Sequence, residues 1–151
     1  MTSILKHGCA LFMVLLASSG VRGQADCVLG VGITPDSTLA QVFQLNAVQT
    51  KELLNYSAEL RYRKDVLNIG LENYVKRQPQ GSLEELQQLA GHYKKVMDSM
   101  TSLQRMIDKR LLKLFNEEQY QRYRLMCLEV QRSPYVVTPT VYPDSLAVKK
   151  R

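Results

Sequence analysis

Hydrophobic residues in the middle of the chain, from Leu83 to Leu114, recur in alternating steps of three and four positions. This stripe consists of Leu86, Leu89, Tyr93, Val96, Met100, Leu103, Ile107, Leu111 and Leu114. A helix places positions with this spacing on one face. At 1.5 Å rise per residue the helix would be about 48 Å long, which is longer than a compact domain of this size needs. We therefore expect it to lie along a second helix.

The stretch from Asn46 to Arg77 is the predicted partner of this helix. Its apolar residues recur mainly every seven positions, at Leu53, Tyr56, Leu60, Leu67, Leu71 and Tyr74. The segment 78–81, which contains proline and glycine, ends the helix. Gly70 is a weak point inside it, costing about 1 kcal/mol relative to alanine. Because a short connection makes neighbouring helices antiparallel, the two are predicted to form a hairpin.

Three helix starts carry the residue pair of a capping box, in which the cap side chain and the third helical side chain bond each other's backbone amides. The pairs are Asn46 with Gln49, Ser82 with Glu85, and Asn116 with Gln119. Thr38 and Gln41 form another such pair, predicted to open a short helical turn through Phe43. The pair of Asn116 and Gln119 opens a fourth helix that is expected to end near Arg132. Its apolar face holds Tyr120, Tyr123, Cys127 and Val130.

Residues 1–23 have the pattern of an export signal. Lys6 and His7 precede a short apolar run, and small residues follow it as far as Gly23. The run is shorter than the roughly 20 residues of a bilayer span. A lipoprotein signal is the alternative, but neither Cys9 nor Cys27 follows the apolar and small residues expected before a lipidated cysteine. We expect cleavage after Gly23, export, and no stable membrane insertion.

The net charge does not favour a nucleic-acid partner. Removal of Lys6 and Arg22, with no acidic residue, lowers the formal charge from +6 to +4. Most of the remainder is in the final residues 149–151. The domain between is close to neutral, with basic residues interleaved among acidic ones, whereas nucleic-acid binding requires a face of one sign. We therefore expect no nucleic acid among the partners.

Non-helical segments flank the helices on both sides. Residues 24–37 are rich in glycine and apolar side chains and are predicted to form an N-terminal arm lying on the domain. The helical domain spans residues 38–132. From residue 133 onward, Pro134, Pro139 and Pro143 exclude helix. The tail 133–151 is predicted to be extended and mobile, with a groove or a strand edge as the alternative location for residues 135–141.

Two cysteines remain after processing, so the one disulfide that can form within the chain joins Cys27 to Cys127. This disulfide would join the N-terminal arm to the last helix. In the chain-entropy model a closed loop of about 100 residues stabilises by roughly 4 to 5 kcal/mol. Two independent thiols, or a disulfide between two copies of the chain, are the alternatives.

Two helix starts, at Asn46 and Asn116, share one pattern seventy positions apart. The copies read Leu45-Asn46-Ala47-Val48-Gln49 and Phe115-Asn116-Glu117-Glu118-Gln119. In this respect the chain resembles the Spy and CpxP family of periplasmic proteins, whose members carry two copies of Leu-Thr-x-x-Gln. Asn replaces Thr in both copies and Phe replaces Leu in the second, and these changes keep the capping chemistry. The resemblance covers about residues 38–132, together with the signal peptide and the order of helices.

The resemblance implies a periplasmic, all-α protein in which a long antiparallel helical hairpin carries a short helix at each end. Members of the family form antiparallel, cradle-shaped dimers that hold unfolded clients without ATP, and some act in envelope stress. We therefore expect a homodimer that holds unfolded or misfolded envelope proteins, with a link to the stress response. The alternative is a structural or regulatory adaptor that binds one specific envelope partner.

A client-binding surface needs exposed apolar patches mixed with basic residues, and methionine adapts to many shapes. The candidate client-binding residues are Arg61, Tyr62, Arg63, Lys64, Met97, Arg105, Met106 and Lys109. Core packing is the alternative for the methionines, because Met97 and Met106 flank Met100 in the stripe. A solvated face, with Asp65 and Asp108 beside it, is the alternative for the basic residues.

No catalytic constellation is present in the pattern. His92, the one histidine after processing, has Gln88 and Val96 one turn away, so it lacks an acidic neighbour on its helix. One histidine and two distant cysteines do not supply the clustered ligands of a zinc site. The sequence also lacks a glycine-rich phosphate loop and a catalytic triad. We expect no enzyme activity, cofactor or metal.

Overall fold

The computed structural model describes residues 25–140, and the predicted signal peptide lies outside them. Four helices follow one another: α2 (Asp36–Val42), α3 (Ala47–Arg77), α4 (Leu83–Lys113) and α5 (Glu117–Glu129). Within this part of the chain no strand forms, and the single isolated bridge joins Asp26 to Ser133. The fold class is all-α.

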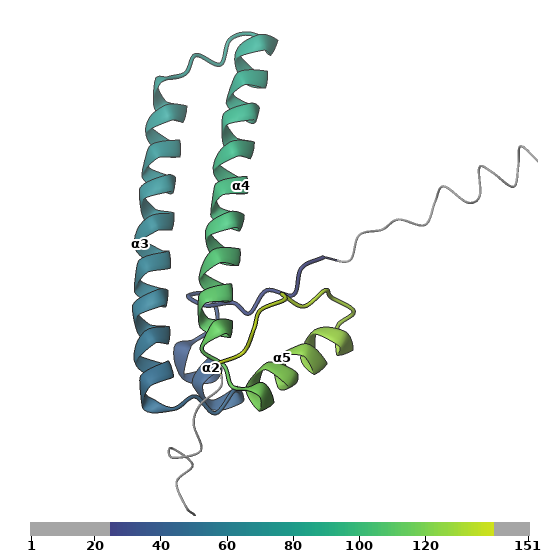
Figure 1. The fold of residues 1–151 in the computed structure, drawn as a ribbon. Helices are drawn as coiled ribbons and strands as arrows, with labels where there is room; N and C mark the ends of the chain where they lie inside the picture. The colour runs from purple at the N-terminus through teal and green to yellow at the C-terminus, as the bar shows by residue number, and fades with distance from the viewer. Residues whose placement is uncertain (1–24, 141–151) are drawn as a thin grey trace, which may run out of the picture.

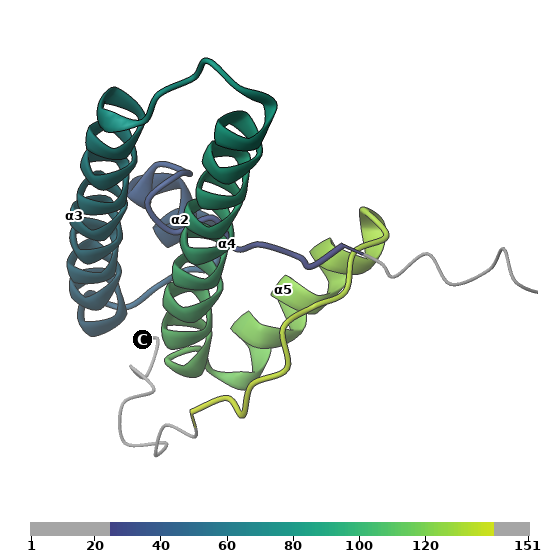
Figure 2. The same cartoon turned by 90° about the horizontal axis from the view of Figure 1, so that it is seen from above.

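The two long helices, α3 and α4, run side by side in opposite directions (Figure 1). Both α2 and α5, together with the two terminal segments, gather at the end of this hairpin where α3 begins and α4 ends. The view from above gives the same arrangement (Figure 2). We call this end the base, and we call residues 62–103 the distal half of the hairpin. Towards the turn at 78–82, α3 and α4 stand without a third layer from the described residues.

Side-chain caps fix three of the helix starts. Asn46, Ser82 and Asn116 each accept from the third helical amide, and the third side chain bonds the cap backbone in return. The prediction of a capping box at Thr38 is wrong. α2 begins earlier, after Pro35, whose φ of −52° is set by its ring and is close to the helical value. The carbonyl of Pro35 accepts from the amides of Thr38 and Leu39, so this start is closed by the backbone alone.

The core lies at the base. Seven apolar side chains of the described residues have no exposed surface there: Val31, Leu53, Ile107, Leu111, Leu112, Phe115 and Cys127. The apolar stripe of α4 therefore divides along its length. Ile107 and Leu111 are fully buried, whereas Leu86 and Tyr93 are 46% and 52% exposed. Packing explains the lower part of the stripe, and in the upper part Leu86 and Tyr93 remain accessible whereas Val96 is buried.

The terminal segments pack on the base and on each other. The amide of Cys27 donates to the carbonyl of Ser133 at 2.8 Å, and a disulfide joins Cys27 to Cys127. The expectation of a mobile tail is wrong for residues 133–140. Tyr135 is 6% exposed and belongs to the core, and Thr140 donates its amide to the carbonyl of Phe115 at 2.9 Å. The rest of the predicted tail lies outside the described residues.

Candidate functional site

The two repeated motifs meet at the base. Gln49 and Gln119, the third residues of α3 and α5, are both buried. Gln49 Nε2 donates to Gln119 Oε1 at 2.8 Å, and Gln119 Nε2 donates to Gln49 Oε1 at 3.1 Å. Each side-chain oxygen also accepts from the backbone amide of its own cap, Asn46 or Asn116, at 2.9 Å. The two capping boxes therefore form one hydrogen-bonded unit.

The pairing of the motifs extends to the residues that precede them. Gln49 Nε2 donates to the carbonyl of Leu114 at 2.5 Å, and Gln119 Nε2 donates to the carbonyl of Gln44 at 3.2 Å. Positions 44 and 114 are related by the same offset of seventy as the motifs. Phe43 and Phe115 pack beside them, with ring centroids 4.9 Å apart. Because this unit is closed and buried, its role is to hold the base together.

Asp108 anchors the N-terminal arm. It has no exposed surface, and its carboxylate accepts from the backbone amides of Leu29, Gly30 and Val31 at 2.9, 3.3 and 3.1 Å. The side chain of Gln104 donates a fourth bond at 3.0 Å. The interpretation of Asp108 as part of a solvated face is therefore wrong, because the arm covers this turn of α4.

Lys64 reaches the same network from α3. Its Nζ donates to Gln104 Oε1 at 2.7 Å. Burial lowers the pKa of Lys64, and the negative charge of Asp108 opposes this shift. Burial raises the pKa of Asp108, and the hydrogen bonds from Gln104 and the arm oppose that shift. Lys64 thus links α3 to α4 and the arm.

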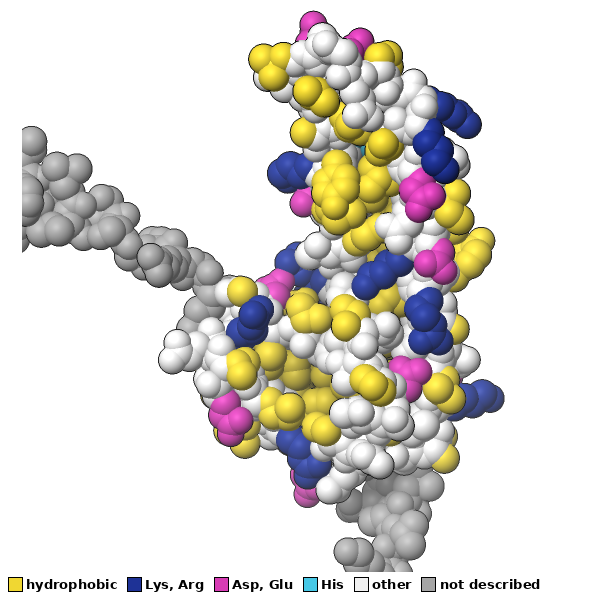
Figure 3. Space-filling view, turned by 180° about the vertical axis from the view of Figure 1, so that it is seen from behind, with side chains coloured by type: hydrophobic (Ala, Val, Ile, Leu, Met, Phe, Trp, Pro, Cys, Tyr) yellow, Lys and Arg dark blue, Asp and Glu magenta, His cyan; other side chains and the backbone are white. Residues whose placement is uncertain are grey.

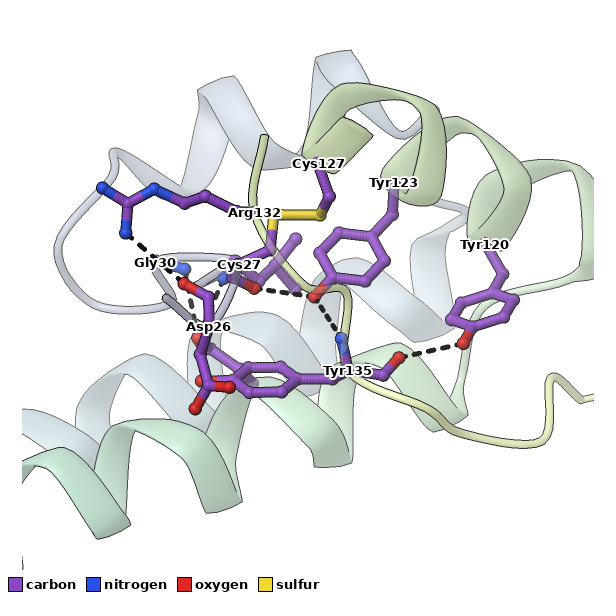
Figure 4. Close-up of a disulfide and its surroundings, with 10 residues drawn as sticks. Asp26, Cys27, Gly30, Tyr120, Tyr123, Cys127, Arg132 and Tyr135 are labelled. Atoms are coloured by element: carbon purple, nitrogen blue, oxygen red, sulfur yellow. Dashed lines mark hydrogen bonds between the residues drawn. A yellow bond between two sulfur atoms is a disulfide. The ribbon is translucent and has the colours of Figure 1, made fainter. Parts of the chain in front are cut away.

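Two tyrosines of α5 hold both terminal segments, and Figure 4 shows them beside the disulfide. Tyr123 donates its hydroxyl to the carbonyl of Cys27 at 2.7 Å and accepts from the amide of Tyr135 at 2.9 Å. Tyr120 donates to the carbonyl of Tyr135 at 2.9 Å. Burial raises the pKa of Tyr123 to about 12, so the hydroxyl keeps its proton in ordinary solution. These contacts and the disulfide make the base a rigid support for the hairpin.

A shallow groove runs between α3 and α4 along the distal half of the hairpin. It consists of two hollows, of about 400 and 560 Å³, which share Val66 and Leu67. Leu71 and Val96 complete the apolar lining of the first hollow, and Leu103 belongs to the second. We call this feature the hairpin groove.

The hairpin groove belongs to a part of the molecule where apolar side chains face solvent. Val66 is 52% exposed and Tyr62 is 70% exposed. The space-filling view shows hydrophobic side chains gathered over the upper hairpin, with basic and acidic side chains along its edges (Figure 3). Exposed apolar groups that gather in this way mark interaction surfaces more often than isolated ones do.

The structure divides the candidate client-binding residues into two groups. Tyr62 and Arg63 line the hairpin groove, and Arg63 pairs with Glu59 at 2.8 Å. Arg61 is exposed on the same helix but does not line the groove. Met97 is half-buried. Only two members of the predicted set therefore lie in this groove.

The remaining candidates contact the base or its terminal segments. Met106 is half-buried and packs against the core. Arg105 pairs with Asp26 of the arm, and the ammonium of Lys109 lies 5.4 Å from the centre of the Tyr135 ring. Like Lys64, these side chains have partners within the chain and are not grouped with Tyr62 and Arg63.

His92 is half-buried and lines the hairpin groove, where its ring stacks on that of Tyr74 with centroids 3.8 Å apart. Residues 25–140 contain no cluster of three His, Cys, Asp or Glu side chains placed to hold a metal ion. The hairpin groove is lined by apolar side chains, by the rings of Tyr74 and His92, and by the basic side chains of Arg63 and Arg77.

Sequence reasoning missed Asp108 and Gly70. The stripe of α4 gave no sign that the arm covers Asp108, because the donors are backbone amides of Leu29, Gly30 and Val31. Gly70 was identified only as a weak point in a helix, although it lines the groove. Its place on the same helix face as Val66 and Tyr74 was the available signal.

Comparisons with family models, with curated proteins and with solved structures find no match to this chain. Among the described helices, none is both long enough and apolar enough to cross a bilayer.

Proposed function

We propose that this protein is an exported, ATP-independent chaperone-like protein that holds unfolded or misfolded envelope proteins in its hairpin groove. The proposal includes periplasmic localisation and a link to envelope stress. In this proposal the base and the distal half have different roles. The base keeps the two helices in register, and the distal half makes the contacts with clients.

The observation that carries this proposal is the apolar lining of the groove, which Val66 and Tyr62 expose to solvent while Leu71 and Val96 form its buried floor. Val66 and Leu67 belong to both hollows, and no third layer from the described residues covers them. A shallow groove of this kind makes few contacts with any one segment, so binding is weak and reversible. Basic residues at its edge, such as Arg63 and Arg77, add attraction that does not depend on a particular sequence.

The paired motifs support the likeness to the Spy and CpxP family. Both copies cap a helix, and their glutamines bond each other at the base. A repeated motif used in this reciprocal way is more specific than two separate helix caps. The Spy-like fold remains part of the proposal.

A homodimer is the second part of the proposal. Leu86 and Tyr93 are about half exposed and do not line the hairpin groove, so they offer apolar surface for a second copy. Burial of this surface would stabilise the distal half while leaving the groove open. Analytical ultracentrifugation at micromolar concentration tests this part, and a monomer under those conditions contradicts it.

The test of holding is suppression of aggregation. The purified protein is added in several-fold excess to malate dehydrogenase diluted from guanidinium chloride, and light scattering is followed. We expect the wild type to suppress scattering, and absence of suppression contradicts the proposal. A single tight, stoichiometric partner together with no effect on this client would favour the adaptor alternative.

Matched variants locate the activity. Val66→Asp places a charge in the groove, whereas Leu54→Asp places one on another face of the same helix, at a residue that is also 52% exposed and does not line the groove. We expect Val66→Asp to lose most of the suppression and Leu54→Asp to retain it. Equal losses would show that the groove is not the holding surface.

A further inference from the structure

Gly70 opens a notch in the wall of the hairpin groove. A Cβ atom built at this position meets no atom within 4 Å, and the residue lines the hollow of about 400 Å³. Val66 and Tyr74 lie one turn to either side on the same face of α3. The missing side chain therefore leaves room for a side chain from outside.

Aromatic rings form part of the wall of this notch. Tyr74 of α3 and His92 of α4 stack with an interplanar angle of 16°, and both line the same hollow as Gly70. Leu71 and Val96 add apolar surface. Aromatic side chains bury large apolar areas and gain further from offset or edge-to-face contact with other rings. This wall favours an aromatic guest over a small aliphatic one.

The charge around the notch is of one sign. Arg77 lines the same hollow, and Arg63 lines the adjoining one. No acidic residue lines either hollow. Arg63 is already paired with Glu59, so Arg77, which is exposed, is the stronger attractant for a carboxylate. Charge complementarity therefore selects segments that carry acidic residues.

We propose that the Gly70 notch binds an aromatic side chain of an unfolded polypeptide segment whose neighbouring residues are acidic. The inference rests on the proposed function and names the class of client sequence that the groove prefers. Tyr74 and His92 contact the guest ring, and Arg77 contacts the adjacent carboxylate.

Synthetic peptides test this preference directly. The protein contains no tryptophan, so the fluorescence of one tryptophan in a capped peptide reports only the guest. Peptides with tryptophan between glutamates are compared with peptides in which lysines replace the glutamates. We expect the tryptophan emission of the glutamate peptide to shift to shorter wavelength on binding. We also expect this peptide to bind about tenfold more tightly than the lysine peptide. Equal affinity, or tighter binding of the lysine peptide, overturns the proposal.

Two glycine variants locate the bound peptide. Gly70→Leu fills the notch, and Gly91→Leu is the control, because Gly91 also lies within a long helix with nothing within 4 Å of its Cβ but does not line the groove. Both changes favour helix, so loss of folding does not explain a loss of binding. We expect Gly70→Leu to weaken the glutamate peptide at least about tenfold and Gly91→Leu to leave it within about twofold. Unchanged binding by Gly70→Leu overturns the notch assignment.

The charge contact has its own variant. Arg77→Gln should remove most of the difference between the glutamate and lysine peptides while keeping the blue shift. A preserved difference overturns the role of Arg77.

Failure of the notch is distinguishable from failure of the holding function. If the wild type suppresses aggregation while Gly70→Leu binds peptide normally, the notch assignment falls and the holding function stands. If the wild type binds the peptide in the notch but does not suppress aggregation, the holding function falls and the notch assignment stands.

Discussion

At the residue scale, Tyr123 connects the alkaline stability of the base to one hydroxyl. Its pKa is raised to about 12 by burial, above the ordinary value of 10. Because the pKa of Tyr123 is higher in the folded than in the unfolded protein, its contribution to the free energy of unfolding is fully present below pH 10. That contribution is lost as the pH rises towards 12. A shift of about two units corresponds to roughly 3 kcal/mol.

We therefore expect the free energy of unfolding of the wild type to fall more steeply between pH 10 and 12 than that of Tyr123→Phe. Urea denaturation at several pH values measures the two slopes. Other tyrosines titrate in both proteins, so the difference between them isolates Tyr123. Parallel slopes would show that burial does not raise the pKa of Tyr123.

Asp108 is the second residue whose replacement has a large expected effect. Asp108→Ala leaves three buried backbone amides of the arm without their acceptor. Breaking a buried charged contact of this kind typically costs about 3 to 5 kcal/mol. Asp65→Ala is the control, because Asp65 is exposed, and such a change typically stays within about 0.5 kcal/mol. The midpoint of urea denaturation measures both, and similar midpoints would contradict the anchoring role of Asp108.

At the element scale, the start of α3 and the start of α5 depend on each other. Gln49→Ala, Gln119→Ala and the double variant form a double-mutant cycle across the two capping boxes. Each of the two glutamine side chains bonds the other and also a backbone carbonyl that precedes the other motif. We therefore expect a coupling free energy of about 1 kcal/mol. The exposed box at Ser82 supplies the control: Glu85→Ala should show no coupling to either glutamine. Additive effects at Gln49 and Gln119 would mean that the two motifs act separately.

How far the elements could be predicted depends on how local their causes are. Capping boxes use residues three positions apart, so Asn46 with Gln49 and Asn116 with Gln119 were readable from the sequence. The start of α2 was misplaced because the backbone of Pro35, not a side chain, closes its first turn. The packing of residues 133–140 depends on Tyr120 and Tyr123 of another element, and such long-range contacts leave no periodic signal.

The same reasoning applies to the candidate site. Tyr62 and Arg63 were identified because an aromatic residue stands among basic residues in this part of α3. Lys64 and Lys109 have the same residue character, but their partners Gln104 and Tyr135 come from other parts of the chain. The hairpin groove itself arises from two helices at once, so neither helix alone predicts it.

At the scale of the whole molecule, the disulfide secures the rigid base. It joins residues 100 positions apart, and in the chain-entropy model a loop of that length contributes about 4 to 5 kcal/mol. We expect the variant with Cys27→Ser and Cys127→Ser to lose a similar amount in urea denaturation. A loss below about 1 kcal/mol would show that the hydrogen bonds of Tyr123 and Asp108 suffice to hold the arm.

Division into a rigid base and an accessible distal half is the central claim about this molecule. Buried polar contacts, the disulfide and the core lie at one end, while apolar residues remain exposed at the other. If function depends on this division, an unfolded client should touch the hairpin groove and not the outer faces of the same helices.

Site-specific photocrosslinking measures this contact most directly. Benzoylphenylalanine is introduced in place of Val66 in one protein and in place of Leu54 in another, and each is irradiated with an unfolded client. We predict crosslinks from position 66 and few from position 54, because Val66 lines the hairpin groove whereas Leu54, which is equally exposed, lies on another face of α3. Equal crosslinking from the two positions, or crosslinking from position 54 alone, would contradict the assignment of the groove as the holding surface.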